Sequence, residues 1–363
     1  MLRFPLFFLL ATSAILISPS NLDAREIVVS SFGKLSTGEE AKLYTLENSA
    51  GVRVKLSDFG ALLVSVEAPD RDDNLSKVTL SYKNAAEAEK GGVFGNVVGR
   101  FANRIDTGGF TINDVRYDLE TVNPKTKVHI HGGKTGFQRQ LWKTELLPPK
   151  AVKFSLTSPD GHEGYPGRVE VSVTYSLNDD GELILHYRGT TDKPTHLNLT
   201  NHAYFNLSGS GDVLDHELAL TCDEVLEVDS RKIPTGKRLS VKDSPFDFRK
   251  GKKIGRDIAG VNDGGYDHCF IVSEENMRKA VIHFASLSDP ASGRTLDIST
   301  TCPGVQVFTA NHFKGKPFPK WGGICFETQF YPDAPNKPGF PSTLLRPGET
   351  YEEITEFHFG VLK

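Results

Sequence analysis

The sequence has only 2 methionines and 4 cysteines in 363 residues, and its net charge of −4 is small. No basic patch or arm is present, which argues against nucleic acid as a partner. The cysteines are too few for a disulfide scaffold and show no CxxC or metal-ligand spacing. Two disulfides are possible in an exported chain, but Cys269 and Cys325 lie in apolar strand-like runs, where a free thiol behaves as a small hydrophobe.

Long apolar runs are absent beyond the N-terminus, so no later segment reaches the length of about 20 residues that spans a bilayer. Residues 1–24 have the pattern of a secretory signal peptide, with Arg3 before an apolar segment at 4–17 and small residues after it. An uncleaved anchor is the alternative. We expect residues 25–363 to form one secreted or periplasmic domain that does not contact the membrane.

Glycine (34), phenylalanine (23) and proline (20) are abundant, which is typical of strands joined by turns. The clearest strand is 169–177, where Val169 and every second residue after it are apolar. Residues 178–181 predict a turn and 182–187 a returning strand, so this region is a β-hairpin.

Similar strand-like runs occur along the whole chain. They cover residues 52–56, 62–67, 77–82, 109–119, 153–157, 217–222, 280–284, 295–299, 305–309, 324–329 and 351–359. Only residues 84–90 predict a helical turn. This pattern predicts an all-β fold, a large antiparallel β-sandwich.

One stretch, His196 to Gly209, breaks the apolar pattern with a second histidine, His202, and three asparagines. Burying such groups costs free energy unless they find hydrogen-bond partners. The stretch is therefore either exposed or lines a cavity for a polar ligand, and His202 at its centre is the first candidate for a functional residue.

Other segments also break strand rules. They are residues 99–105, 131–137, 160–167, 265–268 and 326–329. Each has a simple alternative, since Arg104 could form a surface ion pair and Glu327 could face water. Together they offer an acid, histidines, an arginine and amides in glycine-punctuated segments, which is the chemistry that a polyhydroxylated ligand needs.

These segments together resemble the aldose 1-epimerase, or galactose mutarotase, family. The resemblance rests on Gly99-Arg-Phe-Ala-Asn-Arg-Ile105, Ile130-His-Gly-Gly133, Asp160-Gly-His-Glu-Gly-Tyr-Pro-Gly167, Asn198-Leu-Thr-Asn-His-Ala-Tyr-Phe-Asn-Leu207, Gly265-Tyr-Asp-His268, Pro303-Gly-Val-Gln306, Glu327-Thr-Gln329 and Pro332-Asp-Ala-Pro-Asn336. These motifs occur in order from about Phe32 to the C-terminus, so the resemblance covers nearly the whole mature chain.

The resemblance implies a galactose mutarotase-like β-supersandwich that interconverts the α and β anomers of free hexoses such as glucose and galactose. It implies that His202 is the general acid and Glu327 the general base. It places Asn103, Arg104, His131, Asp267 and Gln306 at sugar-binding positions. It implies no metal and no cofactor, and the expected partner is a small-molecule aldose, bound by a monomer or weak dimer. Departures from the family pattern, at residues 138–139, 269 and 310–312, leave the sugar preference open.

The chemistry requires a proton to leave the C1 hydroxyl while another reaches the ring oxygen, so that the ring opens, rotates and recloses. We expect His202 and Glu327 to face one pocket, a sugar ring apart. Burial should raise the pKa of Glu327, while a cationic His202 would lower it, and the sequence leaves the balance open. The rival functions are a non-catalytic carbohydrate-binding protein and a glycoside hydrolase that pairs Glu327 with Asp267.

Overall fold

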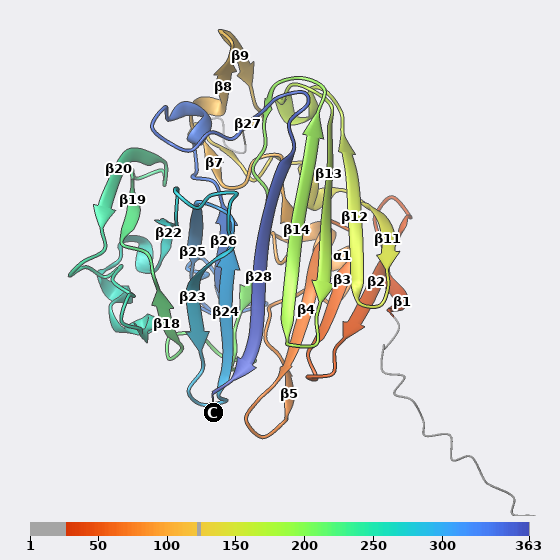
Figure 1. The fold of residues 1–363 in the computed structure, drawn as a ribbon, viewed down its shortest axis with the longest axis vertical. Coiled ribbons are helices and arrows are strands. Elements are labelled where there is room, and N and C mark those ends of the chain that lie inside the picture. Colours follow the sequence, from red (N-terminus) through yellow and green to blue (C-terminus); the bar gives the residue numbers. More distant parts are fainter. Residues whose placement is uncertain (1–26, 122–124, 363) are drawn as a thin grey trace, which may run out of the picture.

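The computed structural model describes residues 27–121 and 125–362, which form an almost entirely antiparallel β structure (Figure 1). The all-β prediction is confirmed. The predicted signal peptide, residues 1–24, lies outside the described residues. Within the described part of the chain, no helix has both the length and the apolar character needed to cross a membrane.

The largest sheet has nine strands in the order β11-β12-β13-β14-β28-β24-β23-β18-β21 (Figure 1). These are β11 (Lys143–Leu147), β12 (Ala151–Ser158), β13 (Val169–Leu177), β14 (Glu182–Thr191), β28 (Tyr351–Val361), β24 (Arg294–Thr300), β23 (Ile282–Ser288), β18 (Glu217–Leu220) and β21 (Lys252–Lys253). β13 and β14 form the predicted hairpin, with Val173 opposite Tyr187. The five apolar residues expected on one face of β13 are all buried, so that face points into the core.

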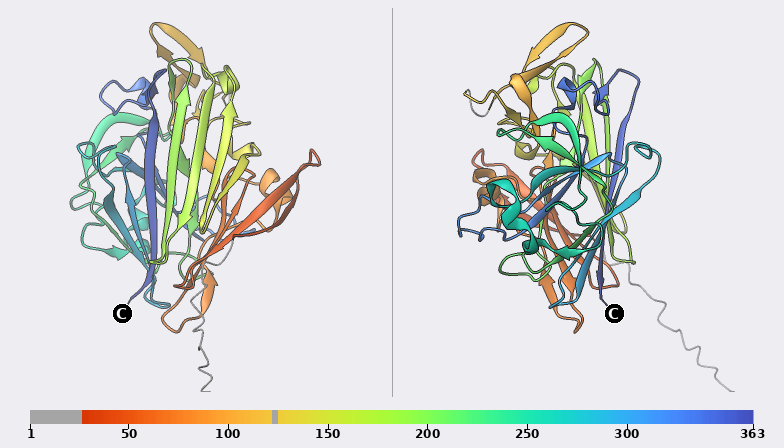
Figure 2. Two further views of the ribbon diagram at one scale, coloured as in Figure 1. Left: turned by 45° about the vertical axis from the view of Figure 1, so that its right-hand side comes forward. Right: turned by 90° about the vertical axis from the view of Figure 1, so that its left-hand side faces the viewer.

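Two smaller sheets pack against this one (Figure 2). The five-stranded sheet contains β1 (Val28–Lys34), β2 (Glu40–Glu47), β3 (Arg53–Ser57), β4 (Leu62–Pro69) and β5 (Leu75–Lys77) in sequence order. The six-stranded sheet has the order β17 (Tyr204–Phe205), β26 (Ile324–Gln329), β25 (Gly304–Phe308), β22 (Asp267–Ile271), β19 (Glu224–Val228) and β20 (Pro234–Ser240).

The main core lies between the nine-stranded sheet and the two smaller sheets. The rings of Tyr44 on β2 and Phe154 on β12 are 5.7 Å apart, and those of Phe205 on β17 and Phe357 on β28 are 5.1 Å apart. The hydroxyl of Tyr175 on β13 donates to the Ala61 carbonyl at 2.7 Å. These contacts make the molecule a sandwich, because each sheet buries one apolar face against another. The four cysteines are buried free thiols, so no disulfide contributes to the fold.

Short strands and helical turns connect the sheets. The paired short strands are β6 (Val97–Val98) with β16 (Thr200–Asn201), β7 (Arg104–Ile105) with β10 (His129–Ile130), β8 (Gly109–Ile112) with β9 (Val115–Asp118), and β15 (Thr195–His196) with β27 (Leu344–Leu345). Helix α1 (Ala85–Lys90) is the predicted helical turn, and the Asn84 side chain caps it by accepting from the Glu87 N–H. The 3₁₀ turns are η1 (Asp106–Gly108), η2 (Phe137–Arg139), η3 (His162–Gly164), η4 (Ile254–Arg256), η5 (Ile258–Gly260), η6 (Asn262–Gly264) and η7 (Ala334–Asn336).

Two of the predicted strands are wrong in detail. The run 109–119 is a hairpin of β8 and β9, because Asn113 and Asp114 take positive φ angles of 49° and 64° and turn the chain. The run 77–82 is not one strand. After β5 it crosses between sheets, and Thr79 forms an isolated bridge with Phe205 on β17. Both errors come from turn or crossover geometry that the apolar pattern does not record.

Candidate functional site

A cavity of about 70 Å³ opens on the face of the six-stranded sheet that points away from the main core. It is lined by Asn103, Arg104, His131, His202, Asp267, Phe308, His312 and Glu327. Six of the seven residues predicted from sequence are therefore brought together. The seventh, Gln306, lies beside the cavity and donates from Nε2 to Asp267 Oδ1 at 2.6 Å.

Strand register places three of these groups. Across β22, β25 and β26, Gln306 is paired with Cys269 on one side and with Glu327 on the other. Directly opposed residues point to the same face of an antiparallel sheet, and the face repeats every second residue. Asp267, two residues before Cys269, therefore shares the cavity face with Gln306 and Glu327. The alternate residues, such as Phe326 and Val307, pack into the main core.

His202 reaches the same cavity from the irregular segment between β16 and β17. Its N–H donates to the Asn96 carbonyl at 3.1 Å, and its carbonyl accepts from Gly95 N–H at 2.8 Å. These bonds fix the backbone. The imidazole Nε2 lies 3.5 Å from Glu327 Oε1.

The predicted common pocket for His202 and Glu327 is found, but the expected separation of a sugar ring is wrong. Tyr204 on β17 is directly opposite Cys325 on β26, so the two segments are neighbours at the ordinary spacing of about 4.8 Å between strands. The imidazole of His202 and the carboxyl group of Glu327 are therefore in contact, and a ligand must approach the pair from one side.

Burial controls the protonation of this pair. Glu327 is 2% exposed, and its Oε2 has no hydrogen-bond partner. Burial, helped by the nearby Asp267 charge and opposed by Arg104, raises the pKa of Glu327 to about 8. Burial also lowers the pKa of His202 to about 4. Near neutral pH the pair therefore holds one exchangeable proton, and in the resting site burial favours its location on Glu327 rather than on His202.

Arg104 and Asp267 form the charged side of the cavity. Their Nη2 and Oδ2 atoms are 3.3 Å apart. Burial opposes the charge on Asp267, but the Arg104 guanidinium and the Gln306 amide keep the pKa of the Asp267 carboxyl below its usual value. Asp267 is therefore an ionised acceptor, and Arg104 is a fixed donor close to Glu327.

Asn103 and His131 hold each other in left-handed backbone conformations, with φ angles of 65° and 52°. The Asn103 N–H donates to His131 Nδ1 at 3.2 Å, and the His131 N–H donates to the Asn103 carbonyl at 3.0 Å. Burial lowers the pKa of His131 well below its usual value, so the ring is neutral. Because Nδ1 accepts, Nε2 carries the hydrogen, and His131 is a hydrogen-bond donor.

Comparison with known proteins identifies the family of the chain. The profile of the aldose 1-epimerase family matches residues 42–358. The chain belongs to the aldose 1-epimerase family. It is 41% identical to rat galactose mutarotase over 342 residues, which cover 91% of this chain and 97% of that protein. It is 35% identical to the aldose 1-epimerase of Escherichia coli K12, over 89% of this chain and 96% of that protein.

Solved structures extend the likeness to the fold. The GalM/aldose epimerase homologue from C. elegans has a TM-score of 0.82 at 31% identity and covers 89% of this chain and 100% of that chain. Galactose 1-epimerase from Lactobacillus acidophilus has a TM-score of 0.81 at 27% identity and covers 93% of this chain and 100% of that chain. The protein is thus an isomerase with the galactose mutarotase fold.

Not every polar segment singled out in this aldose 1-epimerase belongs to the cavity. Arg100 is buried and donates to the carbonyls of Ser158, Pro159 and Pro166, so it ties loops together. Conversely, Phe308 and His312 line the cavity but were not predicted as site residues. Phe308 is two residues after Gln306, so strand alternation could have indicated it. His312 lies in a loop, where no such periodicity applies.

Within the described residues, His131, His202 and Glu327 form the one group of donor atoms close enough to share a metal ion, all within 4.8 Å of one another. The cationic guanidinium of Arg104 lines the same cavity and opposes a second positive charge.

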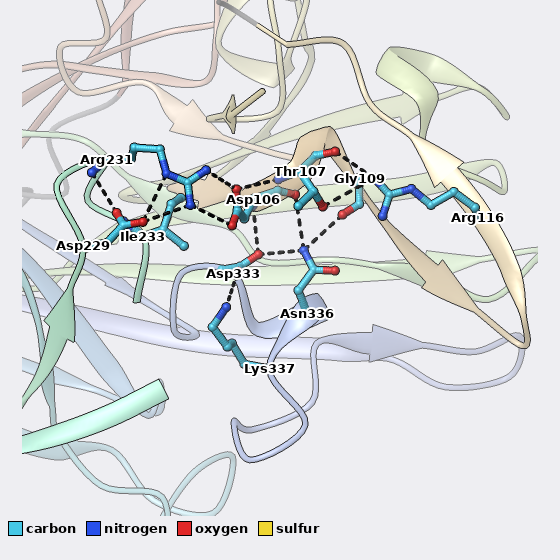
Figure 3. Close-up of polar contacts among 10 residues, drawn as sticks. All are labelled: Asp106, Thr107, Gly109, Arg116, Asp229, Arg231, Ile233, Asp333, Asn336 and Lys337. Atoms are coloured by element: carbon cyan, nitrogen blue, oxygen red, sulfur yellow. Dashed lines mark hydrogen bonds and ion pairs between the residues drawn. The ribbon is translucent and has the colours of Figure 1, made fainter. Parts of the chain in front are cut away.

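A polar network centred on Asp106 and Asp333 (Figure 3) is joined to the backbone of Arg104. The Asp333 N–H donates to the Arg104 carbonyl at 2.7 Å, and its Oδ1 accepts from the Asp106 N–H at 2.9 Å. Asn336 and Lys337 also donate to the Asp333 carboxylate, at 2.7 and 2.6 Å. Asp333 therefore clamps the backbone on both sides of Ile105, directly after Arg104.

Asp333→Ala should lower the free energy of unfolding by about 2–4 kcal/mol, because it leaves buried donors unpaired and puts alanine at a φ of 57°. It should also raise KM, since Arg104 loses its clamp. Arg231→Ala is the matched control. Arg231 contacts Asp106 in the same network, but its side chain is 40% exposed, so its loss should cost less than about 1 kcal/mol. Equal losses in urea denaturation would contradict the clamp.

Proposed function

We propose that this protein interconverts the α and β anomers of free hexoses such as glucose and galactose, with Glu327 as the base and His202 as the acid. The observation that carries the proposal is the buried contact of 3.5 Å between Glu327 Oε1 and His202 Nε2 in a cavity lined by sugar-binding types of side chain. Such a pair can accept one proton and donate another without a net change in charge.

Ring opening begins from the charge-separated form of the pair. The Glu327 proton passes to His202 Nε2, and Arg104, whose charge lowers the pKa of Glu327, stabilises the carboxylate. Glu327 then takes the proton of the C1 hydroxyl, His202 protonates the ring oxygen, and the bond between C1 and the ring oxygen breaks. The aldehyde rotates, the two transfers run in reverse, and the ring recloses on its other face. Asn103, His131, Asp267 and Gln306 hold the hydroxyl groups meanwhile.

Two other functions fit the site less well. A carbohydrate-binding protein needs no matched acid and base, yet Glu327 is kept buried beside His202. A glycoside hydrolase needs a second free carboxylate, but both oxygens of Asp267 are engaged, by Arg104 and by Gln306. Release of reducing sugar from an oligosaccharide would favour the hydrolase, and faster mutarotation of α-D-glucose or α-D-galactose favours the epimerase.

Glu327→Gln and His202→Asn should each lower kcat by at least about 100-fold, because each removes one proton-transfer group. The measurement is polarimetry of α-D-glucose and α-D-galactose. Two buried residues outside the cavity provide matched controls. Glu353→Gln removes a buried carboxylate held by Arg278, and His196→Asn removes a buried imidazole bonded to Thr343. The controls should keep kcat, and a near-normal kcat in either site variant would refute the assignment.

The pH dependence of kcat/KM should be a plateau between about pH 4 and about pH 8. Below about pH 4, His202 is protonated while Glu327 is also protonated, so the pair holds two protons and no base remains. Above about 8, Glu327 loses the shared proton and no acid remains. In Glu327→Gln the alkaline limb should vanish from the residual activity. A wild-type profile that stays flat through pH 9.5 would contradict this shared proton.

We also propose that residues 1–24 are a cleaved signal peptide and that residues 25–363 act as one exported domain, a monomer or weak dimer. Support comes from Arg3, the apolar segment that follows it and the small residues after that segment. N-terminal sequencing of protein from the medium or periplasm should start close to residue 25. Retention of Met1 on exported protein would contradict cleavage.

A further inference from the structure

One face of β26 presents two side chains to the same imidazole. Cys325 and Glu327 are two residues apart, so both point to the cavity side of the sheet. Cys325 Sγ lies 3.5 Å from His202 Nδ1, and Glu327 Oε1 lies 3.5 Å from His202 Nε2. Each ring nitrogen of His202 therefore has a partner from this one strand.

The ring of His202 has few other restraints. Its ring lies against Tyr204 with 5.1 Å between ring centroids and the planes tilted by 31°, and it packs edge-on against His131 at 5.3 Å. These contacts leave open which nitrogen carries the hydrogen. The Cys325 thiol is completely buried, and burial raises its pKa well above the usual value, so it is a neutral group at Nδ1.

The proposed reaction requires one particular tautomer. Nε2 must accept the proton of Glu327 and later pass a proton to the sugar, so in the neutral ring Nε2 must be bare and Nδ1 must carry the hydrogen. A buried N–H without an acceptor is costly, and Cys325 Sγ is the side-chain acceptor within reach of Nδ1, besides the backbone carbonyl of His202 itself.

Resting on the proposed function, we propose that Cys325 is a positioning residue for His202. Its sulfur accepts the Nδ1–H of the imidazole and so keeps Nε2 as the atom that exchanges a proton with Glu327 and the sugar. A thiol suits this role because it is a weak, uncharged acceptor. A carboxylate at the same place would stabilise the imidazolium and make it a poorer acid.

The charged and titratable groups that face His202 come from several segments. Glu327 and Cys325 come from β26, His131 follows β10, Tyr204 lies on β17, and Asp267 begins β22. The Tyr204 hydroxyl also hydrogen-bonds to the Cys325 thiol. Asp267 is the one ionised carboxylate of this set, and it is held by Arg104, so no carboxylate competes with the thiol for Nδ1.

Nitrogen NMR of histidine-labelled protein tests the tautomer directly and without substrate. At neutral pH the wild type should show His202, identified by its absence in His202→Asn, with a protonated Nδ1 and a bare Nε2. In Cys325→Ala the signals should shift toward the other tautomer. A wild-type ring with its hydrogen on Nε2 would overturn the proposal.

The kinetics of three variants test whether the bond between Cys325 and His202 affects turnover. Cys325→Ala should lower kcat about 10- to 100-fold with little change in KM, as loss of a partner behind a functional histidine does. Cys325→Ser should recover most of kcat, because its hydroxyl oxygen can accept the same hydrogen bond. Cys222→Ala, which truncates an equally buried cysteine in the main core, should leave kcat unchanged.

Full kcat in Cys325→Ala, or an equal loss in Cys222→Ala, would show that the thiol only fills space. Failure of the proposed role of Cys325 can be distinguished from failure of the proposed function. If the wild type does not accelerate mutarotation, the function is wrong, while the tautomer measured by NMR still decides whether Cys325 holds the ring.

Discussion

The buried carboxyl group of Glu327 is the constraint on which the site depends. An ionised carboxylate with an unpaired oxygen is unfavourable when it is buried, so burial raises the pKa of Glu327 and the group is protonated at neutral pH. Its neighbours set how far it can be ionised. The positive charge of Arg104 lowers the pKa of Glu327 and the negative charge of Asp267 raises it. Because Arg104 and Asp267 form an ion pair, their effects on Glu327 partly cancel. Burial thus places the pKa of Glu327 at about 8, within reach of neutral pH.

Much of the structure around the cavity fixes the backbone of the residues that line it. His202 is held by backbone bonds to residues 95 and 96, and Arg104 by the backbone clamp of Asp333. Asn103 and His131 support each other through reciprocal bonds from the left-handed region. A side chain held this way loses little freedom when a ligand binds, which is how a small cavity lined equally by strands and loops can be well ordered.

Much of the architecture and most of the site could be predicted from the sequence. The hairpin of β13 and β14 follows from strict alternation, and His202 was found because polar groups in a strand-like run need partners. Taken singly, Arg104 and Glu327 each had a simple alternative, and the roles expected for all seven site residues needed the family resemblance. The 3.5 Å contact and the balance between burial and charge could not be predicted, because both depend on which segments become neighbours. His312 was missed because a loop has no periodicity to reveal its direction.

The shared register of β22, β25 and β26 has an evolutionary consequence. A single-residue insertion in any of these strands would turn its polar groups into the core and its apolar groups into the cavity. The positions of Asp267, Gln306 and Glu327 on one face of the sheet therefore depend on a single strand register. The loop that carries His312 is not bound in this way and can change length or sequence while the register of the sheet residues is preserved. A change in that loop would reshape one wall of the cavity and leave the contact between Glu327 and His202 in place.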